Sequence, residues 1–417
     1  MKCIATRAFP VLLFVFALML FSSCEEDGII VSEHIKLKVE KNSDNGMKLT
    51  WNKVHISDYS HYEIYRFTTK PDLLHLEEYY YSSIHTVSNE NQTTYTDYNY
   101  PISEELYYVV VARYPEKISN MASVKIEGVE TIDQNISNAF FDNGSIYYLK
   151  SYYNVLKKYD IASSEVTHEL ELESAYGGVF CMSSYQGEKE LLLGAGSWFY
   201  VVDAVNLTVK KKVEYNSMIN GIASDNSGRI FISTYYNGIS SILRSDFSTI
   251  GNYGSYYDEY NLFYHENSLY AIEDDSWASF NQFEVLSNGA LQYQNGVNTG
   301  INGERTKFFP TIEKFVSAYD TKVLDLSGNV IGCFVYSDYN SVAYDVEYIN
   351  SKNWFATAGY SEKKIKCYNV NNFLLEKTYS TLAQPYYIHF YNNILYSLGG
   401  SQGGNSNSYI LEKIELN

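Results

Sequence analysis

The stretch Asn138–Ile161 reads NAFFDNGSIYYLKSYYNVLKKYDI, and its pattern recurs until seven copies fill the C-terminal part of the chain. Each copy has an apolar run, a turn, an aromatic-rich run, a polar loop and a third apolar run. The turn in this copy, Asp142-Asn143-Gly144, is a strong signal for a β-hairpin between alternating runs. The other copies begin near Gly178, Gly221, Asn261, Lys307, Ser341 and Tyr387.

The period of the repeat indicates how the copies are organised. It is roughly 41 residues, which lies within the range of four-stranded propeller blades. One blade cannot bury both of its faces alone, so the copies are expected to pack around a central axis. The sequence therefore predicts an all-β chain in which residues 129–417 form a seven-bladed β-propeller. The last copy offers only three strands, so residues near Val129–Ile132 are expected to supply the fourth and close the ring.

Residues 34–128 contain about seven short runs of β character separated by turn signals, a number typical of a β-sandwich. This segment resembles fibronectin type III. Trp51 stands where that family has its core tryptophan, Tyr62–Arg66 matches the third strand, and Tyr108–Ala112 matches the sixth, with Tyr108 as the corner tyrosine. The resemblance implies a spacer domain. The segment has no Arg-Gly-Asp, so cell-adhesion activity is not implied.

Residues 1–23 have a basic start, the apolar run PVLLFVFALMLF and two serines, which together predict a secretory signal peptide. Leu20–Cys24 resembles the lipobox of bacterial lipoproteins, which implies cleavage before Cys24 and its lipidation. Residues 24–33 are then a lipid-anchored tether. The acidic Glu25–Asp27 resembles the surface-export signal of Bacteroidetes lipoproteins, so the resemblance implies an outer-membrane protein that faces the cell exterior. A plain signal peptide with a chance cysteine is the alternative.

Composition excludes several function classes. The formal net charge of −18 and the lack of a basic patch argue against a nucleic-acid partner. Cys181, Cys333 and Cys367 form no C-x-x-C pair and lie in apolar surroundings, so buried free thiols are expected. The chain has no H-E-x-x-H or G-x-S-x-G motif. No metal and no cofactor are expected.

Propellers bind through the loops at one end of the axis, namely those between the second and third strands of a blade and those between blades. Tyr and Trp in these loops are suited to stacking on sugar rings or to anchoring a protein interface, and arginine to polar contacts. For any single tyrosine a purely structural role is the stronger alternative, because the chain has 43 of them. The predicted ligand-binding residues are Tyr153, Tyr176, Tyr236, Tyr257, Trp277, Arg305 and Tyr319.

The function predicted from these features is a non-catalytic cell-surface binding lipoprotein whose propeller loops bind a glycan or an outer-membrane protein partner. A structural subunit of an outer-membrane assembly is one alternative. Ser224–Phe231 resembles an Asp-box of sialidase propellers, but a hairpin turn explains it and the scarcity of arginine argues against a sialidase. A propeller glycoside hydrolase or polysaccharide lyase is a further alternative. Hydrolysis by two carboxylates requires that they face each other across the bond, and spacing in the sequence does not reveal this. The loops offer Asp258, Glu259, Asp274, Asp275, Glu304 and Asp320.

Overall fold

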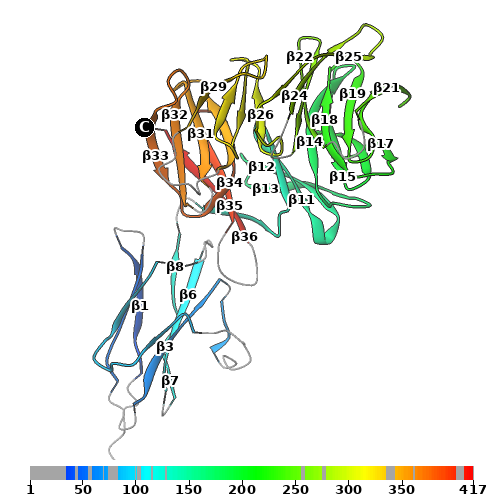
Figure 1. The fold of residues 1–417 in the computed structure, drawn as a ribbon. Coiled ribbons are helices and arrows are strands. Elements are labelled where there is room, and N and C mark those ends of the chain that lie inside the picture. Colours follow the sequence, from blue (N-terminus) through cyan, green and yellow to red (C-terminus); the bar gives the residue numbers. More distant parts are fainter. Residues whose placement is uncertain are drawn as a thin grey trace, which may run out of the picture. The chain divides into compact units, whose positions relative to one another are not determined.

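The computed structural model describes residues 34–42, 46–54, 59–68, 70–73, 83–98, 100, 105–113, 116–126, 129–254, 259–274, 279–334, 343–359, 362–400 and 408–416. The chain divides into two compact units, residues 1–98 with 105–125, and residues 99–104 with 126–417. Regular structure in the described residues is almost entirely β-strand (Figure 1), which confirms the all-β prediction. No helix in these ranges has the length and apolar character needed to cross a bilayer.

The first unit holds two antiparallel sheets. One has three strands, in the order β1 (Leu37–Lys41), β2 (Met47–Trp51), β5 (Thr94–Asp97). In the other, β8 (Ala122–Lys125) also pairs with β6, and the remaining order is β4 (His85–Val87), β3 (His61–Phe67), β6 (Glu105–Arg113), β7 (Lys117–Ile118).

Side chains from the two sheets of the first unit meet in a buried core. The Trp51 ring lies edge-on to the Tyr62 ring, with 5.6 Å between their centroids. The Tyr108 hydroxyl and the Arg66 guanidinium both donate to Oδ2 of the buried Asp97, at 3.0 and 2.7 Å. Trp51, Tyr62 and Tyr108 are each at most 3% exposed, as expected for aromatic side chains that fill the core between two sheets.

The second unit contains seven four-stranded antiparallel sheets among its described residues, here numbered blades 1 to 7. The first strands of several neighbouring blades contact one another, whereas the fourth strands are largely exposed, so the first strands are the inner ones. Blade 1 consists of β10 (Asn138–Asp142), β11 (Ser145–Lys150), β12 (Val155–Asp160) and β13 (Glu165–Glu171). Blade 2 consists of β14 (Val179–Tyr185), β15 (Glu188–Ala195), β16 (Trp198–Asp203) and β17 (Val209–Glu214). Blade 3 consists of β18 (Ile219–Ser224), β19 (Arg229–Thr234), β20 (Gly238–Leu243) and β21 (Thr249–Tyr253).

The other four blades follow the same antiparallel order. Blade 4 consists of β22 (Tyr260–His265), β23 (Ser268–Glu273), β24 (Ser279–Val285) and β25 (Leu291–Asn298), and blade 5 of β26 (Thr306–Phe309), β27 (Lys314–Ser317), β28 (Lys322–Leu324) and β29 (Val330–Cys333). Blade 6 consists of β30 (Ala343–Ile349), β31 (Trp354–Gly359), β32 (Lys364–Asn369) and β33 (Leu375–Ser380). Blade 7 consists of β34 (Gln384–Tyr391), β35 (Ile394–Gly400), β36 (Ser408–Glu415) and β9 (Val129–Gln134).

The fourth strand of blade 7 comes from the segment that precedes blade 1. Strand β9 pairs with β36, with Glu130 opposite Leu411. This confirms the closure predicted from the missing strand of the last copy. An ion pair between Lys413 Nζ and Glu130 Oε1 at 2.7 Å spans the same two strands. Residues far apart in the sequence therefore form one sheet.

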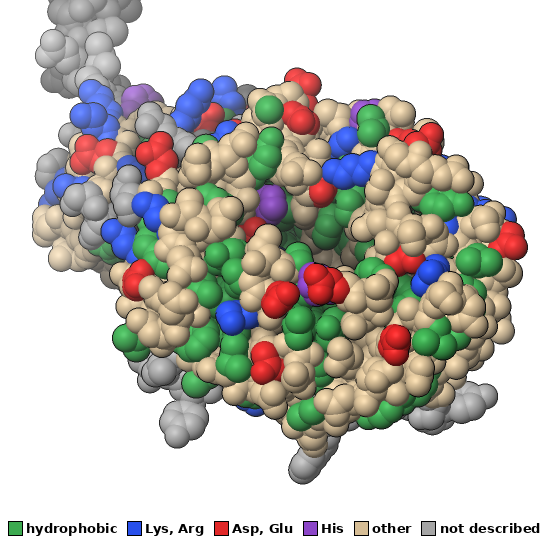
Figure 2. Space-filling model, turned by 90° about the horizontal axis from the view of Figure 1, so that it is seen from above, with side chains coloured by type: hydrophobic (Ala, Val, Ile, Leu, Met, Phe, Trp, Pro, Cys, Tyr) green, Lys and Arg blue, Asp and Glu red, His purple; other side chains and the backbone are tan. Residues whose placement is uncertain are grey.

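Seven apolar clusters hold the blades together, one between each pair of neighbours. The seventh lies between blade 7 and blade 1 and includes Leu398, Leu411 and Tyr148, so the ring is closed by packing as well as by hydrogen bonds. Close approach also requires small residues. A Cβ on Gly221 of β18 would lie 2.1 Å from the Tyr260 carbonyl oxygen of the next blade. Figure 2 shows one face of the molecule, which has a hollow near its middle.

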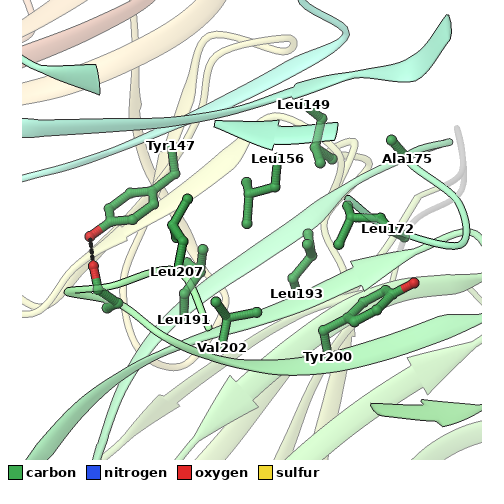
Figure 3. Packing of buried hydrophobic residues seen from close by; sticks show 12 residues of the cluster. Tyr147, Leu149, Leu156, Leu172, Ala175, Leu191, Leu193, Tyr200, Val202 and Leu207 are labelled. Atoms are coloured by element: carbon green, nitrogen blue, oxygen red, sulfur yellow. Dashed lines mark hydrogen bonds between the residues drawn. The ribbon is translucent and has the colours of Figure 1, made fainter. Parts of the chain in front are cut away.

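The cluster between blades 1 and 2 shows how a tyrosine serves this packing (Figure 3). Tyr147 lies among Leu156, Leu191 and Leu207, and its hydroxyl donates to the Ala204 carbonyl oxygen at 2.7 Å. The apolar body of the ring therefore stays in the core, and its polar tip is satisfied at the edge.

Replacing Tyr147 by Phe should lower the free energy of unfolding by only about 0.5–1.5 kcal/mol, the usual net value of one hydrogen bond. The Ala204 carbonyl is not orphaned by the change, because Lys158 Nζ also donates to it at 3.0 Å. Urea unfolding of the two proteins measures the difference. Leu191→Ala, in the same cluster, is the contrast and should cost about 2–5 kcal/mol. Equal losses in the two variants would contradict this assignment.

The turn that resembles an Asp-box is a hairpin turn held by Asp225. Its Oδ1 accepts from the backbone N–H groups of Ser227, Gly228 and Arg229 at 2.8–3.0 Å. Gly228 has a φ of 120°, which a residue with a Cβ rarely adopts. These bonds account for the motif without any ligand.

The three described cysteines are free thiols, but only part of the burial prediction holds. Cys367 is buried and Cys181 half-buried, and burial raises the pKa of each to about 12, so neither is a thiolate near neutral pH. Cys333 is exposed, and the prediction for it is wrong. The reason is its position in β29, the fourth strand of blade 5, whose outer surface no other blade covers.

Candidate functional site

The predicted ligand-binding residues that the structure describes lie at one end of the propeller. In a four-stranded antiparallel blade, the loop between the second and third strands and the loop to the next blade leave from the same end, here called the interblade end. Five of the residues lie there in the structure, while Tyr257 and Trp277 fall outside the described residues. The five are Tyr153, Tyr176, Tyr236, Arg305 and Tyr319.

The structure does not bring all five together. Tyr153 and Tyr176 follow strands of blade 1, and Tyr236 follows a strand of blade 3; they are 63%, 69% and 44% exposed. Tyr153 lies over Lys150 Nζ at 4.8 Å from the ring centroid, and Tyr236 packs edge-on to Tyr235. These contacts of Tyr153 and Tyr236 are compatible with a structural role, and ligand binding by these two residues and by Tyr176 stays a prediction.

Arg305 and Tyr319 of blade 5 are brought together, and three further tyrosines join them. The guanidinium carbon of Arg305 lies 5.8 Å from the Tyr319 ring centroid and 4.8 Å from that of Tyr344. Tyr344 packs edge-on to Tyr386 at 4.7 Å, and Tyr386 lies 5.8 Å from Tyr409. We call these five residues the arginine–tyrosine cluster. They come from blades 5, 6 and 7, so the cluster spans three neighbouring sheets.

Tyr344 and Tyr386 owe their positions to irregular pairing. In β30 the register shifts between Ala343 and Asp345, and in β34 it shifts between Pro385 and Tyr387. Each tyrosine is therefore the extra residue of a bulge near the start of an inner strand, where bulges redirect side chains. Neither tyrosine lies in a loop, so the loop positions in the sequence do not indicate them. A proline inside a strand, as at Pro385, is a signal for such an irregularity.

The charge of Arg305 is not matched by any described residue. Its Nη1 is buried without a hydrogen-bond partner, and its guanidinium forms no ion pair within the described part of the chain. The Arg305 carbonyl oxygen, by contrast, accepts from Ala318 N–H at 2.9 Å, which fixes the backbone. Cation–π contact with the two tyrosine rings offsets part of the cost of holding the cation there.

The phenol of Tyr409, in the same cluster, stays neutral at physiological pH. Burial raises the pKa of Tyr409 to about 12, with smaller contributions from Tyr386 and Tyr344. Burial, then Tyr409 and Asp345, also raise the pKa of the adjacent Tyr387, against a lowering by Arg305. Phenol and guanidinium groups can both donate hydrogen bonds, so the chemistry of the cluster suits a ligand rich in acceptors.

A second charged group on the inner strands is internally paired. Lys307 Nζ lies 2.7 Å from Asp345 Oδ1, and the other carboxylate oxygen accepts from Ile388 N–H at 2.9 Å. Glu347 Oε1 lies 3.2 Å from His389 Nδ1. Burial lowers the pKa of Lys307, but the two carboxylates raise it by more, so the ammonium stays charged. These groups join blades 5, 6 and 7, and the Lys307 ammonium is already paired within the protein.

The carboxylates considered for catalysis are only partly described. Burial, and then the charge of Asp274, raise the pKa of Glu259, which is the environment of a paired carboxylate. Asp258 and Asp275 lie outside the described residues. Glu304 is exposed, and Asp320 accepts from Asn302 N–H and Ser317 Oγ, so it holds its own turn.

His265, Glu266 and Glu313 bring three potential metal ligands within 4.8 Å of one another. They belong to the hairpins between first and second strands, at the end opposite the interblade end. Both glutamates are exposed, as acidic side chains at hairpins commonly are. Nothing further marks a metal site at these residues.

Comparison with known proteins leads to the fold. Neither a protein-family model nor a curated protein matches the chain. Among solved structures, the β-propeller domain of Cps50 (Swd1) from Myceliophteria thermophila is similar with a TM-score of 0.53 and 10% identity, covering 69% of this chain and 100% of that one. The computationally designed Ika8 protein gives a TM-score of 0.47 and 12% identity, over 68% and 98%. At such identities the first likeness shows the fold alone: the chain contains a β-propeller.

Proposed function

We propose that this protein is a non-catalytic binding protein and that its propeller binds a glycan at the arginine–tyrosine cluster. The observation that carries the proposal is the Arg305 guanidinium, which lies between two tyrosine rings without an ion pair among the described residues. A half-buried cation without a counter-charge is a cost that functional sites tolerate. Arginine and tyrosine are also the residues that dominate binding energy at interfaces.

The geometry favours a ligand with flat, partly apolar faces. Tyr319 is 43% exposed, so part of this side chain is accessible to a ligand although Arg305 lies against its ring. Sugar rings offer an apolar C–H face for stacking and hydroxyl oxygens as acceptors, which matches both parts of the cluster. A partner protein with an exposed aromatic or acidic side chain is the other ligand class, and the experiment below separates the two.

We further propose that the first unit is a fibronectin type III-like spacer and that lipidated Cys24 anchors the chain to the outer membrane, facing outward. The spacer is supported by two sheets that share a core at Trp51, Tyr62 and Tyr108. The anchor is supported by the signal-like residues 1–23 and the lipobox resemblance, which lie outside the described residues. A propeller on a surface tether is well placed to meet an extracellular glycan.

A glycosidase or lyase remains the second candidate because the pKa of Glu259 is raised beside Asp274. A raised pKa is what a general acid in such enzymes requires. The same glycan experiment tests this candidate, because catalysis leaves products of altered mass.

The test is a glycan-array screen of the full chain in mild detergent, with the glycans checked by mass afterwards. We expect specific retention without cleavage. Tyr319→Ala should weaken binding by about 1–3 kcal/mol, with the stacking of nucleobases as a guide. Tyr293→Ala is the matched control, since Tyr293 is also exposed but lies on the outer strand of blade 4. Cleavage would favour the enzyme. Failure to bind any glycan on the array would overturn the proposal and direct the search to a protein partner.

A further inference from the structure

We infer that the glycan bound at the arginine–tyrosine cluster carries a carboxylate, as a uronic acid does, and that this carboxylate pairs with Arg305. The inference rests on the proposed function and names the class of its ligand. Carboxylate is the natural partner of guanidinium, because the planar fork of N–H donors matches two oxygens at once.

Arg305 stands out from the other arginines of the chain. The structure describes five arginines, and four of them have a carboxylate oxygen within 4.0 Å. The exception is Arg305, although the chain has 49 acidic residues against 31 basic ones. Acidic side chains are abundant in this protein, yet none of the described ones pairs with Arg305. We therefore expect the ligand to supply the partner of Arg305. The four paired arginines are Arg66, Arg113, Arg229 and Arg244.

The surroundings select for a single negative charge. Lys322, which leads out of the Tyr319 loop, donates to the carbonyl oxygens of Thr299 and Gly300 at 3.4 and 2.9 Å, so its ammonium is occupied. The net charge of −18 repels a polyanion at long range. One available cation flanked by tyrosines therefore fits one carboxylate on a sugar ring, with the ring stacked on Tyr319, better than it fits a densely sulfated chain.

Matched ligands make the test specific. The probes are oligosaccharides that end in one glucuronate or one galacturonate, each compared with its carboxyl-reduced form, which has the same ring without the charge. Titration calorimetry measures both. We expect the acidic form to bind about 10- to 100-fold more tightly, the range for a hydrogen bond to a charged group. Arg305→Gln should abolish that difference, and Arg305→Lys should keep part of it, because ammonium lacks the two-pronged geometry.

The control variants distinguish recognition of a carboxylate by Arg305 from glycan binding in general. Tyr319→Ala should weaken the acidic and the reduced form by the same factor, because stacking does not depend on the charge. The melting temperature of Arg305→Gln should equal or exceed that of the wild type, since the change removes an unmatched cation; a clear drop would assign Arg305 a structural role and overturn the inference. Equal affinity for both forms would overturn the inference and leave glycan binding intact. Failure to bind any glycan would overturn the proposed function itself.

Discussion

A chain that stops at residue 407 is expected to lose the cooperative folding of its second unit. The cut removes β36, which pairs with β35 on one side and with β9 on the other. It also removes Ile410 and Leu411, both fully buried. Strand β9 is then cut off from its sheet, and blade 7 keeps only β34 and β35. Because each blade is stable only against its neighbours, we expect a loss comparable with the whole stability of a typical domain, about 5–15 kcal/mol.

Thermal unfolding followed by circular dichroism measures this effect. The control is Lys413→Ala, which removes the ion pair to Glu130 across the same two strands but keeps their pairing. Side chains of that pair are 40% and 29% exposed, so the control should cost at most about 1 kcal/mol. A cooperative transition at the wild-type temperature in the truncated chain would show that closure is dispensable.

Replacement of Glu190 by Ala is the second change with a large expected effect. Glu190 is 2% exposed on β15, and its two oxygens accept from Arg244 Nε and Nη2 at 2.9 and 2.8 Å. Arg244 follows β20, so the pair joins blade 2 to blade 3. Removal of one partner leaves Arg244, whose side chain is only 13% exposed, without its counter-charge. We expect a loss of about 3–5 kcal/mol in the free energy of unfolding.

A matched control for Glu190 lies two residues away. Glu188 likewise forms an ion pair, with Lys210 at 2.6 Å, but the Glu188 side chain is 69% exposed. Glu188→Ala should therefore change stability by about 1 kcal/mol or less. Chemical denaturation of both variants measures the two values, and similar losses would mean that burial of the Glu190–Arg244 pair does not set its strength.

The same pair makes stability depend on pH. Burial raises the pKa of Glu190, but Arg244 and Lys210 lower it by more, so the net pKa lies below its ordinary value. The stabilisation is complete above the ordinary pKa and is lost as the pH falls through the folded-state pKa. Glu190→Gln should therefore lose less stability than the wild type between pH 7 and about pH 3. Parallel pH curves for the two proteins would contradict this assignment.

Much of the architecture follows from the sequence because the blade pattern is local. Asn143 and Asn393 have the positive φ that their hairpin turns need, and each turn joins strands of adjacent sequence. The missing strand of the last copy even predicts β9. The position of Cys333 on an uncovered outer strand was not predicted, because apolar flanks do not reveal which face another blade will cover.

The candidate site was predicted only in part, for a related reason. The loop position of Arg305 and Tyr319 placed them correctly at the interblade end. Tyr344 and Tyr386 join them through a one-residue shift in register, which depends on how two strands pair and leaves no periodic trace. The lack of an acidic partner for Arg305 is likewise a property of three-dimensional packing.

The pairing of β9 with β36 also determines when the propeller can be completed during synthesis. Strand β36 leaves the ribosome roughly 270 residues after β9, which at about 5–20 residues per second is a delay of roughly 14–54 s. During that time the ring has no closing strand, and the free edges of its blades are open to wrong partners. The chain therefore completes this fold only after its last blade is made, and a chaperone that covers β9 in the interval would raise its yield.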